Sequence, residues 1–496
     1  MRAGRVARPI SLVAFAALML SPGLWLGPSL DAAVFVLAGV RIRDGYMPYK
    51  DLWDHKPPGS YLLNALGQTV LPWLDSWIVS WLATLVFTGA AIVIFEGLLR
   101  RRLAPTSAFL WSLACLVLMA SYPVTLGGGL TESFAILPLG AALWAVGGAE
   151  SSLRVSASIG CLLSVACLLT LQALPVAVVL FVTAVSRGGG PAALLRRVGG
   201  AVGGGAVLPL ATAAWLAAGG AMGNAVDQLV TYNAAYRNAA VEASDLVVVA
   251  LLLLVCLAIP VAVTIVRMVR SPRAFDRIDW SCLAWVVAYV AYVGYQGRIY
   301  LHYVILVVPP AIWLAGSGMA WLMTRANAPD RRLRPATIGL LVAVVCGFAV
   351  SAVTVVGLYT ALGRIGSDRT KMTNTAAWIE SHTPAWARLF VWGHDPDLYL
   401  LSDRSPYDRY VYDFPLFTGG YAPADHLAAL LADWTASPPQ VIVESTAAAP
   451  LLRAPEAGVD VPGYPLLGSI RDFVRSHYRM AAAFDDYDVY VLMVGS

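Results

Sequence analysis

The sequence of 496 residues is 58% hydrophobic and only 13% charged, about half the charged fraction of a typical soluble domain. This composition excludes an ordinary soluble protein and predicts a polytopic α-helical membrane protein with room for one extramembrane domain. The formal net charge is +4, and no basic cluster is interleaved with aromatic residues, so a nucleic-acid partner is not expected.

Eleven apolar stretches have the length and composition of membrane spans. They cover residues 9–27, 76–99, 105–123, 132–149, 155–170, 173–186, 198–219, 246–266, 279–296, 303–323 and 336–359. The stretches at 155–170 and 173–186 are short, and one helix kinked at Pro175 is the alternative. The first stretch follows three arginines and lacks a small-residue cleavage site, so we interpret it as a signal anchor.

The distribution of lysine and arginine predicts the orientation of these spans. With the N-terminus in the cytoplasm, eighteen of these residues before residue 360 lie on the cytoplasmic side and six lie on the opposite side. This positive-inside bias places the loop at 28–75, the loop at 220–245 and everything after about residue 360 outside the cytoplasm. The prediction is therefore a multi-pass cell-membrane protein with an extracytoplasmic C-terminal domain.

The first outer loop, residues 28–75, concentrates charge between two apolar spans. It carries Asp31, Asp44, Asp51, Asp54, His55 and Lys56. Charged side chains near hydrocarbon are unfavourable, and membrane proteins that retain them generally use them. The loop therefore predicts the functional site.

Asp31 stands at the outer end of the first span, shortly after Pro28. A carboxylate at the membrane surface is partly desolvated, an environment in which it can be tuned to abstract a proton. The alternative is a helix N-cap, a position that Asp favours. Together with the motif downstream, we interpret Asp31 as a candidate catalytic base.

Lys56 is unusual because the chain has three lysines and, of its 34 basic residues, thirty-one arginines. A lysine directly before Pro57-Pro58-Gly59 indicates a compact point charge for a phosphate group, and the alternative is a lysine that snorkels to the interface. Asp54 and His55 are candidates to orient Lys56 or a substrate. No metal site is predicted at His55, because no second histidine lies at ligand spacing.

The segments around this motif are expected to form a cradle for a lipid head group. Pro57-Pro58-Gly59 predicts an extended turn, after which Tyr61, Asn64 and Gln68 recur at helical spacing. The stretch 31–42 predicts an amphipathic helix that lies in the membrane interface.

Candidate site residues also lie in later loops. Glu132 begins the fourth span, where it is either part of the site or a first-turn acid favoured by the helix dipole. His302 and Tyr303, in the run Gly297-Arg298-Ile299-Tyr300-Leu301-His302-Tyr303, are candidates to orient a substrate. The loop at 220–245 carries Tyr232, Asn233, Tyr236 and Arg237, which suit contact with an acceptor sugar or, alternatively, a surface helix.

The C-terminal region, residues 363–496, has the pattern of a small α/β domain. Strand-like runs at 389–392, 410–412 and 441–443 alternate with a helical pattern at 425–434, and 483–492 predicts a hairpin. The run Trp392-Gly393-His394-Asp395-Pro396-Asp397 follows a strand, where α/β domains place ligands, although a plain turn is the simpler interpretation. We expect this domain to help bind an acceptor or a partner.

These motifs resemble those of the GT-C superfamily of polytopic glycosyltransferases, specifically the protein O-mannosyltransferase and aminoarabinose-transferase-like branch. The matches are Asp31, the run Asp54-His55-Lys56-Pro57-Pro58-Gly59, and the run at 297–303 followed by Pro309-Pro310. Many members have a second acidic residue beside the catalytic one. Here Leu30 and Ala32 flank Asp31, so a second carboxylate would come from Asp44, Asp51, Asp54 or Glu132.

The resemblance implies an inverting glycosyltransferase that moves a sugar from a polyprenyl phosphate to an extracytoplasmic hydroxyl on a glycan, lipid or protein. Asp31 would be the general base, and Lys56 with Arg298 would bind the donor phosphate. Asp54, His55, Glu132, His302 and Tyr303 would position the substrate. No cofactor is implied with certainty, and assistance by a divalent cation is left open. The alternatives are a flippase or transporter of lipid-linked glycans, and a non-catalytic scaffold for envelope assembly.

Overall fold

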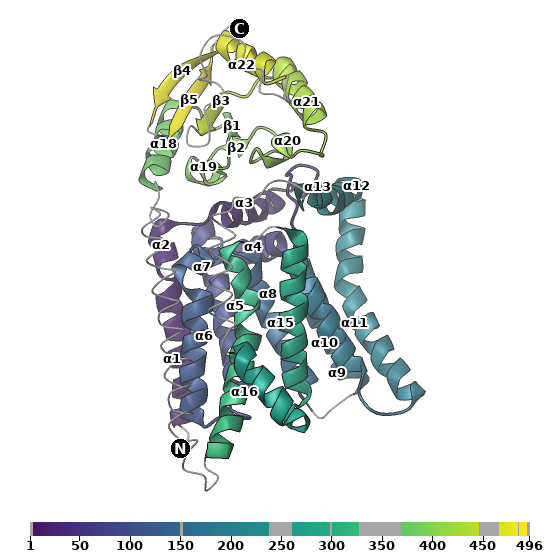
Figure 1. Cartoon of the computed structure of the whole chain (residues 1–496). Coiled ribbons are helices and arrows are strands. Elements are labelled where there is room, and N and C mark those ends of the chain that lie inside the picture. The colour runs from purple at the N-terminus through teal and green to yellow at the C-terminus, as the bar shows by residue number, and fades with distance from the viewer. Residues whose placement is uncertain are drawn as a thin grey trace.

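The computed structural model describes residues 3–148, 152–237, 260–297, 300–326, 369–445, 466–484 and 486–493. Within these residues, a helical part is followed by a small sheet with its own helices (Figure 1). The α-helices of the helical part are α1 (Ala3–Leu20), α2 (Pro22–Leu26), α3 (Leu30–Arg43), α4 (Gly59–Val70), α5 (Ser76–Leu99), α6 (Pro105–Ala120), α7 (Tyr122–Thr125), α8 (Thr131–Val146), α9 (Leu153–Leu169), α10 (Leu174–Val185), α11 (Pro191–Ala218), α12 (Met222–Val226), α13 (Asn233–Arg237), α15 (Arg277–Gln296) and α16 (Val308–Ala326). The π-helix η2 covers Asp227–Tyr232, and the 3-10 helices η1, η3 and η4 cover Leu171–Ala173, Pro272–Ala274 and Leu301–Leu306.

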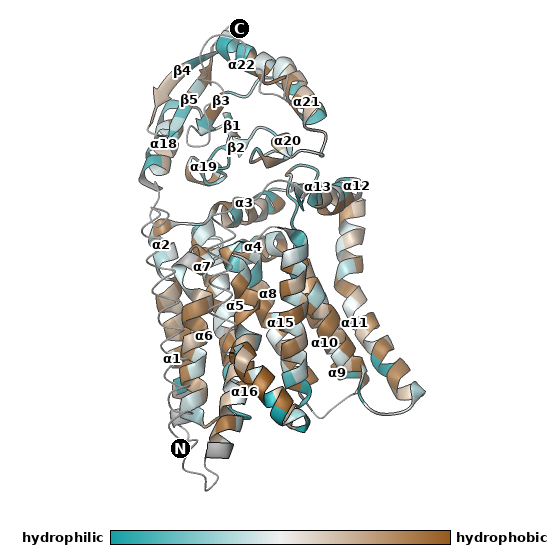
Figure 2. Ribbon diagram, viewed as in Figure 1, coloured by the Kyte–Doolittle hydropathy of each residue, from teal (hydrophilic) through white to brown (hydrophobic). Residues whose placement is uncertain are grey.

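Four helices of the described part are long and apolar enough to cross a membrane. They are Ala7–Leu26, Ser76–Leu99, Pro191–Ala218 and Arg277–Gln296, and shorter apolar helices accompany them at Pro105–Ala120, Thr131–Val146, Leu153–Leu169 and Leu171–Val185. Figure 2 shows apolar residues along most of this helix bundle. Each span predicted before residue 220 therefore overlaps a helix, as do those at 279–296 and 303–323. Most of the span predicted at 246–266, and all of that at 336–359, lie outside the described residues.

The two short spans predicted between 155 and 186 are separate helices, α9 and α10. Between them, Thr170 has an extended backbone, with φ −153° and ψ 137°, and η1 follows it. The extended residue breaks the helical hydrogen-bond ladder, so the alternative of one helix kinked at Pro175 is wrong. Pro175 instead lies in the first turn of α10, where its missing amide leaves no helical bond unmade.

Polar side chains fix helix ends in this bundle. Asp75 caps α5 by accepting from the amides of Trp77 (2.8 Å) and Ile78 (3.2 Å). At the start of α15, the buried Asp279 pairs with Arg267 (2.7 Å) and accepts from Trp313 of α16 (3.0 Å). These contacts set where α5 and α15 begin and tie α15 to α16.

The helix α3 confirms the helix predicted at 31–42, but its predicted amphipathic character is wrong. It lies across the ends of the longer helices, beneath the sheet (Figure 1). All residues from Ala32 to Gly39 are buried, because α4 and α5 pack on one side and α19 (Asp397–Leu401) packs on another. A helix that is apolar all round needs such cover, whereas an amphipathic helix keeps a polar face.

We call the described residues from 369 to 493 the C-terminal unit. Its helices are α18 (Arg369–His382), α19, α20 (Phe414–Phe417), α21 (Pro423–Ala436) and α22 (Leu466–His477). Its strands are β1 (Arg388–Trp392), β2 (Ser405–Pro406), β3 (Val441–Ser445), β4 (Tyr478–Ala483) and β5 (Tyr487–Leu492), in the order β2-β1-β3-β5-β4. The pairs of β1 with β2 and β3 are parallel, and the others are antiparallel.

This sheet confirms the predicted strands at 389–392 and 441–443, the terminal hairpin and the helix at 425–434. The strand predicted at 410–412 is wrong, because these residues form an irregular bend in which Tyr410, Val411 and Tyr412 are all buried. The short β2 pairs with that edge of β1 instead. The predicted boundary between residues 362 and 363 lies outside the described residues.

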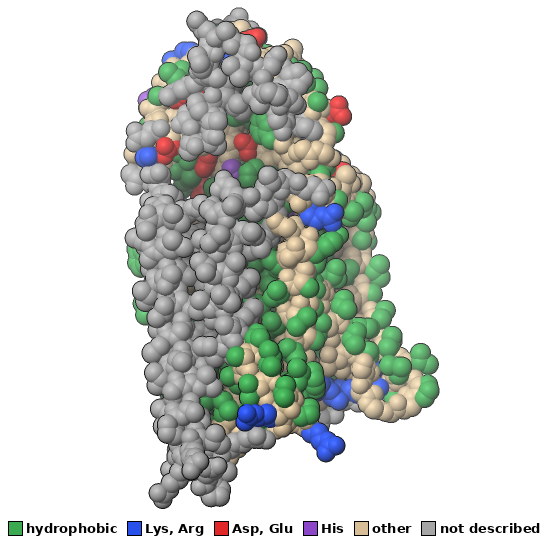
Figure 3. All heavy atoms as spheres, in the orientation of Figure 1, with side chains coloured by type: hydrophobic (Ala, Val, Ile, Leu, Met, Phe, Trp, Pro, Cys, Tyr) green, Lys and Arg blue, Asp and Glu red, His purple; other side chains and the backbone are tan. Residues whose placement is uncertain are grey.

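One hydrophobic core joins the C-terminal unit to the helical part. Buried side chains of α3 and of the loop before α4 pack in the same cluster as those of the sheet, and Trp53 is fully buried there. In Figure 3, acidic side chains and a histidine are visible at the junction between the two. Part of the first outer loop, around α3 and Trp53, is therefore packed against the C-terminal unit.

Candidate functional site

The turn Pro57-Pro58-Gly59 holds the charged motif against α9. Pro57 and Pro58 are buried, and α4 begins at Gly59. A Cβ atom on Gly59 would lie 2.4 Å from the carbonyl oxygen of Leu168, so only glycine permits this contact. The close approach fixes the backbone that carries Lys56.

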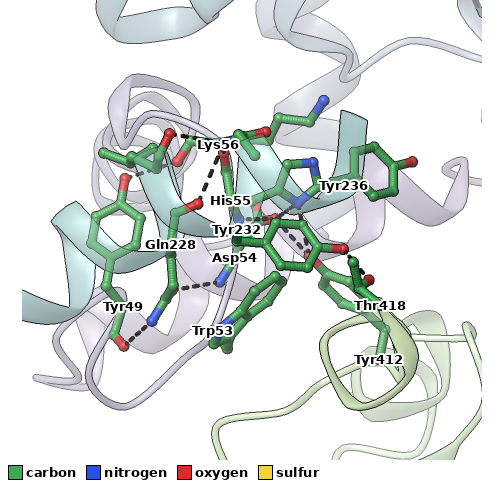
Figure 4. A network of polar contacts seen from close by, with 12 residues as sticks. Tyr49, Trp53, Asp54, His55, Lys56, Gln228, Tyr232, Tyr236, Tyr412 and Thr418 are labelled. Atoms are coloured by element: carbon green, nitrogen blue, oxygen red, sulfur yellow. Dashed lines mark hydrogen bonds and ion pairs between the residues drawn. The ribbon is translucent and has the colours of Figure 1, made fainter. Parts of the chain in front are cut away.

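Asp54 is the centre of a buried hydrogen-bond network (Figure 4). Its carboxylate accepts from the amide of His55 (2.8 Å) and from the hydroxyls of Tyr412 (2.8 Å) and Tyr61. The imidazole of His55 lies 3.4 Å from the same carboxylate and 3.3 Å from the Tyr412 hydroxyl. Burial alone would raise the pKa of Asp54, but His55 and the two hydroxyls lower it overall. Asp54 is thus held ionised by protein partners.

Side chains from η2 and α13 hold the backbone of the same motif. Gln228 accepts from the amide of Asp54 (3.1 Å) and donates to the carbonyl of Tyr49 (2.8 Å), while Asn233 donates to the carbonyl of His55 (3.0 Å). The hydroxyl of Tyr49 donates to the carbonyl of Lys56 (2.8 Å). The loop is therefore preorganised by contacts from segments far apart in the chain.

Asp31 and Lys56 differ from Asp54 because their charged groups have no such partners. Among the described residues, the Asp31 carboxylate and the Lys56 ammonium make no hydrogen bond or ion pair. Figure 4 shows the Lys56 side chain extending away from the network. Burial would lower the pKa of Lys56, but the carboxylates of Asp31, Glu132 and Asp54 outweigh it and raise that pKa. The ammonium therefore lies charged among three carboxylates.

Asp31 lies in the first turn of α3, and Ser29 is the N-cap of this helix. The Ser29 hydroxyl accepts from the amide of Ala32 (3.2 Å). The N-cap alternative for Asp31 is therefore wrong, because the cap position is already filled. This leaves the Asp31 carboxylate available for other contacts.

Glu132 and His302 lie together beneath the motif. Glu132, which is 1% exposed, is 3.9 Å from the Nε2 atom of His302 and accepts from the hydroxyl of Thr170 (3.5 Å). The His302 ring stacks on Tyr300 and meets Tyr303 edge-on. Burial lowers the pKa of His302, although Glu132 and Asp31 oppose this effect. A neutral imidazole here is suited to hydrogen bonding.

The structure brings most of the predicted site residues into one electrostatic neighbourhood. Asp31, Asp54 and Glu132 all act on Lys56, and Asp31 also acts on His302. Arg298 lies outside the described residues. Asp44 and Asp51, considered as second carboxylates, are exposed and serve local turns, where Asp44 pairs with Arg41 and Asp51 accepts from the Met47 amide. Glu132 is the candidate second carboxylate that acts, together with Asp31, on both Lys56 and His302.

The sequence did not predict the hydrogen-bond partners of Asp54, which are Tyr61, Gln228 and Tyr412. Tyr412 lies 358 positions from Asp54 and was assigned to a strand, so no local pattern pointed to it. Gln228 sits in a π-helix, an irregularity that often accompanies functional sites but has no sequence signature. Tyr232 was a candidate for sugar contact, but it is fully buried against Trp53.

The chain was also compared with known proteins. No protein-family model matches the chain, and no curated protein matches it in sequence. Solved structures do match. ArnT from Cupriavidus metallidurans bound to undecaprenyl phosphate has a TM-score of 0.62 and 16% identity, and the match covers 100% of this chain and 99% of that chain.

Two further structures support the same fold. Apo ArnT has a TM-score of 0.57 and 13% identity, with 96% of this chain and 97% of that chain covered. The apo oligosaccharyltransferase of Archaeoglobus fulgidus has a TM-score of 0.51 and 11% identity, with 88% of this chain and 69% of that chain covered. ArnT and this oligosaccharyltransferase are both GT-C proteins. The chain therefore has the fold of the GT-C superfamily, as the resemblance of its motifs predicted.

Proposed function

We propose that this protein is an integral-membrane inverting glycosyltransferase. It moves a sugar from a polyprenyl phosphate to a hydroxyl group of a glycan, lipid or protein on the extracytoplasmic side. The observation that carries the proposal is that Asp31 acts electrostatically on Lys56, while neither charged group makes a hydrogen bond or ion pair among the described residues. In a membrane protein, such groups mark a site that handles polar substrates.

Asp31 is the general base in this proposal. Its carboxylate takes the proton of the acceptor hydroxyl while the oxygen attacks the anomeric carbon of the donor. The bond from that carbon to the phosphate oxygen breaks, and the electron pair leaves with the polyprenyl phosphate. A phosphate is a good leaving group without protonation, so one carboxylate suffices where glycosidases need two.

Lys56 stabilises the charge that develops on the leaving phosphate. Asp31, Glu132 and Asp54 keep the Lys56 ammonium protonated. The hydrogen bond from Tyr49 to the Lys56 carbonyl fixes the backbone from which this side chain extends. Preorganised charge of this kind requires little reorganisation during the reaction. Arg298 is proposed to share the phosphate with Lys56.

The other site residues act as positioning groups. Asp54 and His55 hold the backbone before Lys56, whereas Glu132, His302 and Tyr303 shape the surroundings of the ammonium from below. A polyprenyl-phosphate donor is also supported by the match to ArnT, which was solved with undecaprenyl phosphate bound.

Sugar transfer in detergent tests the proposal. Purified wild type, Asp31→Asn and the exposed control Asp44→Asn each receive radiolabelled polyprenyl-phosphate sugars and an envelope extract as acceptor. Wild type and Asp44→Asn are expected to transfer sugar, and Asp31→Asn is expected to lose at least about hundredfold in rate, as for a missing general base. Equal transfer by Asp31→Asn would remove Asp31 from the mechanism. No transfer by any protein, together with retained lipid binding, would favour a flippase or a scaffold.

A further inference from the structure

His394 of the C-terminal unit lies next to the first outer loop, at the carboxyl end of β1. Gly393 precedes it with φ +149°, and a Cβ atom there would lie 2.6 Å from the Cβ atom of Ser445. The Gly393 carbonyl accepts from the amide of Asp413 (3.1 Å). This tight turn, which only glycine permits, directs the chain out of the sheet at the edge where parallel strands place ligand-binding groups.

Two aromatic rings hold the imidazole of His394. Phe414 stacks on it with ring centroids 4.1 Å apart and an interplanar angle of 8°, and Tyr412 meets it edge-on at 5.0 Å. The hydroxyl of this same Tyr412 donates to Asp54. His394 is therefore separated from the Asp54-His55-Lys56 motif by a single tyrosine ring, and its orientation is fixed.

The Nδ1 atom of His394 is buried and has no hydrogen-bond partner among the residues that the structure describes. Buried polar atoms in native proteins are almost always paired, with protein, water or a ligand. The backbone of Asp54 and His55 and the Asp54 carboxylate are hydrogen-bonded by Gln228 of η2, Asn233 of α13 and Tyr412. An unpaired nitrogen beside these satisfied groups is the feature expected of a contact that a ligand completes.

Burial favours a neutral imidazole at His394, beside the proposed base. Burial lowers its pKa to about 4, and the carboxylates of Asp31 and Asp54 act on it in the opposite direction. A neutral imidazole has one N–H donor and one acceptor nitrogen. It is therefore complementary to a hydroxyl group, which also donates and accepts, and it can bind one without competing with Asp31 for a proton.

We propose that His394 binds the acceptor, with its Nδ1 atom hydrogen-bonded to a hydroxyl group of the acceptor next to Asp31. The C-terminal unit then forms one wall of the acceptor site. This inference rests on the proposed glycosyltransferase function and adds to it the element that recognises the acceptor. The sugar donor lies on the Lys56 side and does not depend on His394.

Two substitutions separate hydrogen bonding from packing at this position. His394→Phe keeps an aromatic ring for Phe414 to stack on but removes both nitrogens, whereas His394→Asn removes the ring and keeps a polar atom where Nδ1 stood. His382→Ala, an exposed histidine of the same unit, is the control. The half-saturating amounts of envelope extract and of radiolabelled donor are measured for each protein, together with its melting temperature with and without undecaprenyl phosphate.

His394→Phe is expected to raise the half-saturating amount of extract about tenfold, the effect of one lost hydrogen bond, with donor saturation and the lipid-induced melting shift unchanged. His394→Asn is expected to stay near wild type. The inference is overturned if the phenylalanine variant saturates normally, or if donor saturation shifts instead, while wild type remains active. A wild-type protein that transfers no sugar would overturn the proposed function, and this inference with it.

Discussion

At the scale of single residues, Lys56 is the cation on which donor binding is proposed to depend. It lies among Asp31, Glu132 and Asp54, and the chain places a lysine here although arginine is ten times more frequent in it, with thirty-one of 34 basic residues. Lys56→Met removes the charge and is expected to lower sugar transfer by about two to three orders of magnitude. Lys56→Arg keeps the charge with a different shape and is expected to lose only about tenfold.

The matched control for Lys56 is Lys50→Met, in the same loop but exposed. Transfer rates and undecaprenyl phosphate binding are measured for all three variants. Loss of transfer by Lys50→Met to the same extent would mean that the loop responds to net charge rather than to a positioned ammonium. That result would contradict the assignment.

The buried carboxyl group of Asp413 predicts that the melting temperature depends on pH. Burial raises the pKa of its carboxyl to about 6, and the charge of Asp395 adds to this effect. A raised folded-state pKa contributes stability below the unfolded value of about 3.9, and this contribution is lost as pH rises through about 6. The melting temperature of the C-terminal unit is therefore expected to fall between pH 4 and pH 7.

Asp413→Asn removes this titration, so its melting curve should depend less on pH over the same range. At pH 7 the variant is expected to be more stable than wild type by about 1–2 kcal/mol, less than the full value of two pKa units because the carboxyl is partly exposed. Asp425→Asn, on the exposed side of α21, is the control and should follow wild type. A wild-type melting temperature that is constant from pH 4 to pH 7 would refute the raised pKa.

At the scale of elements, the contact between the start of α4 and the end of α9 sets the backbone of the motif. Gly59→Ala would place a Cβ atom 2.4 Å from the Leu168 carbonyl oxygen, and backbone cannot move as a flexible side chain does. We expect the substitution to lower the unfolding free energy by about 1–3 kcal/mol and to reduce transfer, because Lys56 shifts with the turn. Thermal unfolding and transfer rates measure the two effects.

The control for this glycine is Gly203→Ala in α11, where a Cβ atom meets nothing within 4 Å. Alanine is the better helix former, so this variant is expected to equal or slightly exceed wild type in stability. If Gly59→Ala behaved like Gly203→Ala, the turn would have room to relax. The position of the motif would then depend on its hydrogen bonds with side chains such as Tyr49, Gln228 and Asn233.

Sequence patterns predicted the helices and strands better than they predicted which distant residues pack against them. Helical periodicity identified α3, and the alternation of strands and helices identified β1, β3 and α21, because these signals are local. Part of the cover over α3 comes from α19, more than 350 residues later, so a helix that is buried all round was predicted to be amphipathic. The same limit applies to the candidate site: Asp31, Lys56 and Glu132 were chosen by residue type and place in the chain, whereas no local pattern pointed to Tyr412 or Gln228.

At the scale of the whole molecule, Trp53 is the residue that joins the first outer loop to the C-terminal unit. Its amide donates to the Arg409 carbonyl (2.8 Å), and its indole packs edge-on against Tyr232 at 4.6 Å and Tyr412 at 5.7 Å. The ring is fully buried, although it lies between two polar segments of the chain. The same buried side chain therefore holds the C-terminal unit against the helical part and keeps the Asp54-His55-Lys56 motif in place.

This coupling predicts that Trp53→Ala acts on both parts of the molecule. Removing a buried indole is expected to destabilise by about 3–5 kcal/mol. Because the ring contacts Tyr412, which donates a hydrogen bond to Asp54, the loss should disturb the motif although Trp53 contacts no reacting atom.

Amide hydrogen exchange is expected to rise in the first outer loop and at 409–421 together, while α5 and α6 stay protected. The rate of sugar transfer should fall at least tenfold. Trp386→Ala, an exposed tryptophan of the C-terminal unit, is the control. Faster exchange in the C-terminal unit alone, with the loop still protected and transfer intact, would show that the helical part organises the motif without the sheet above it.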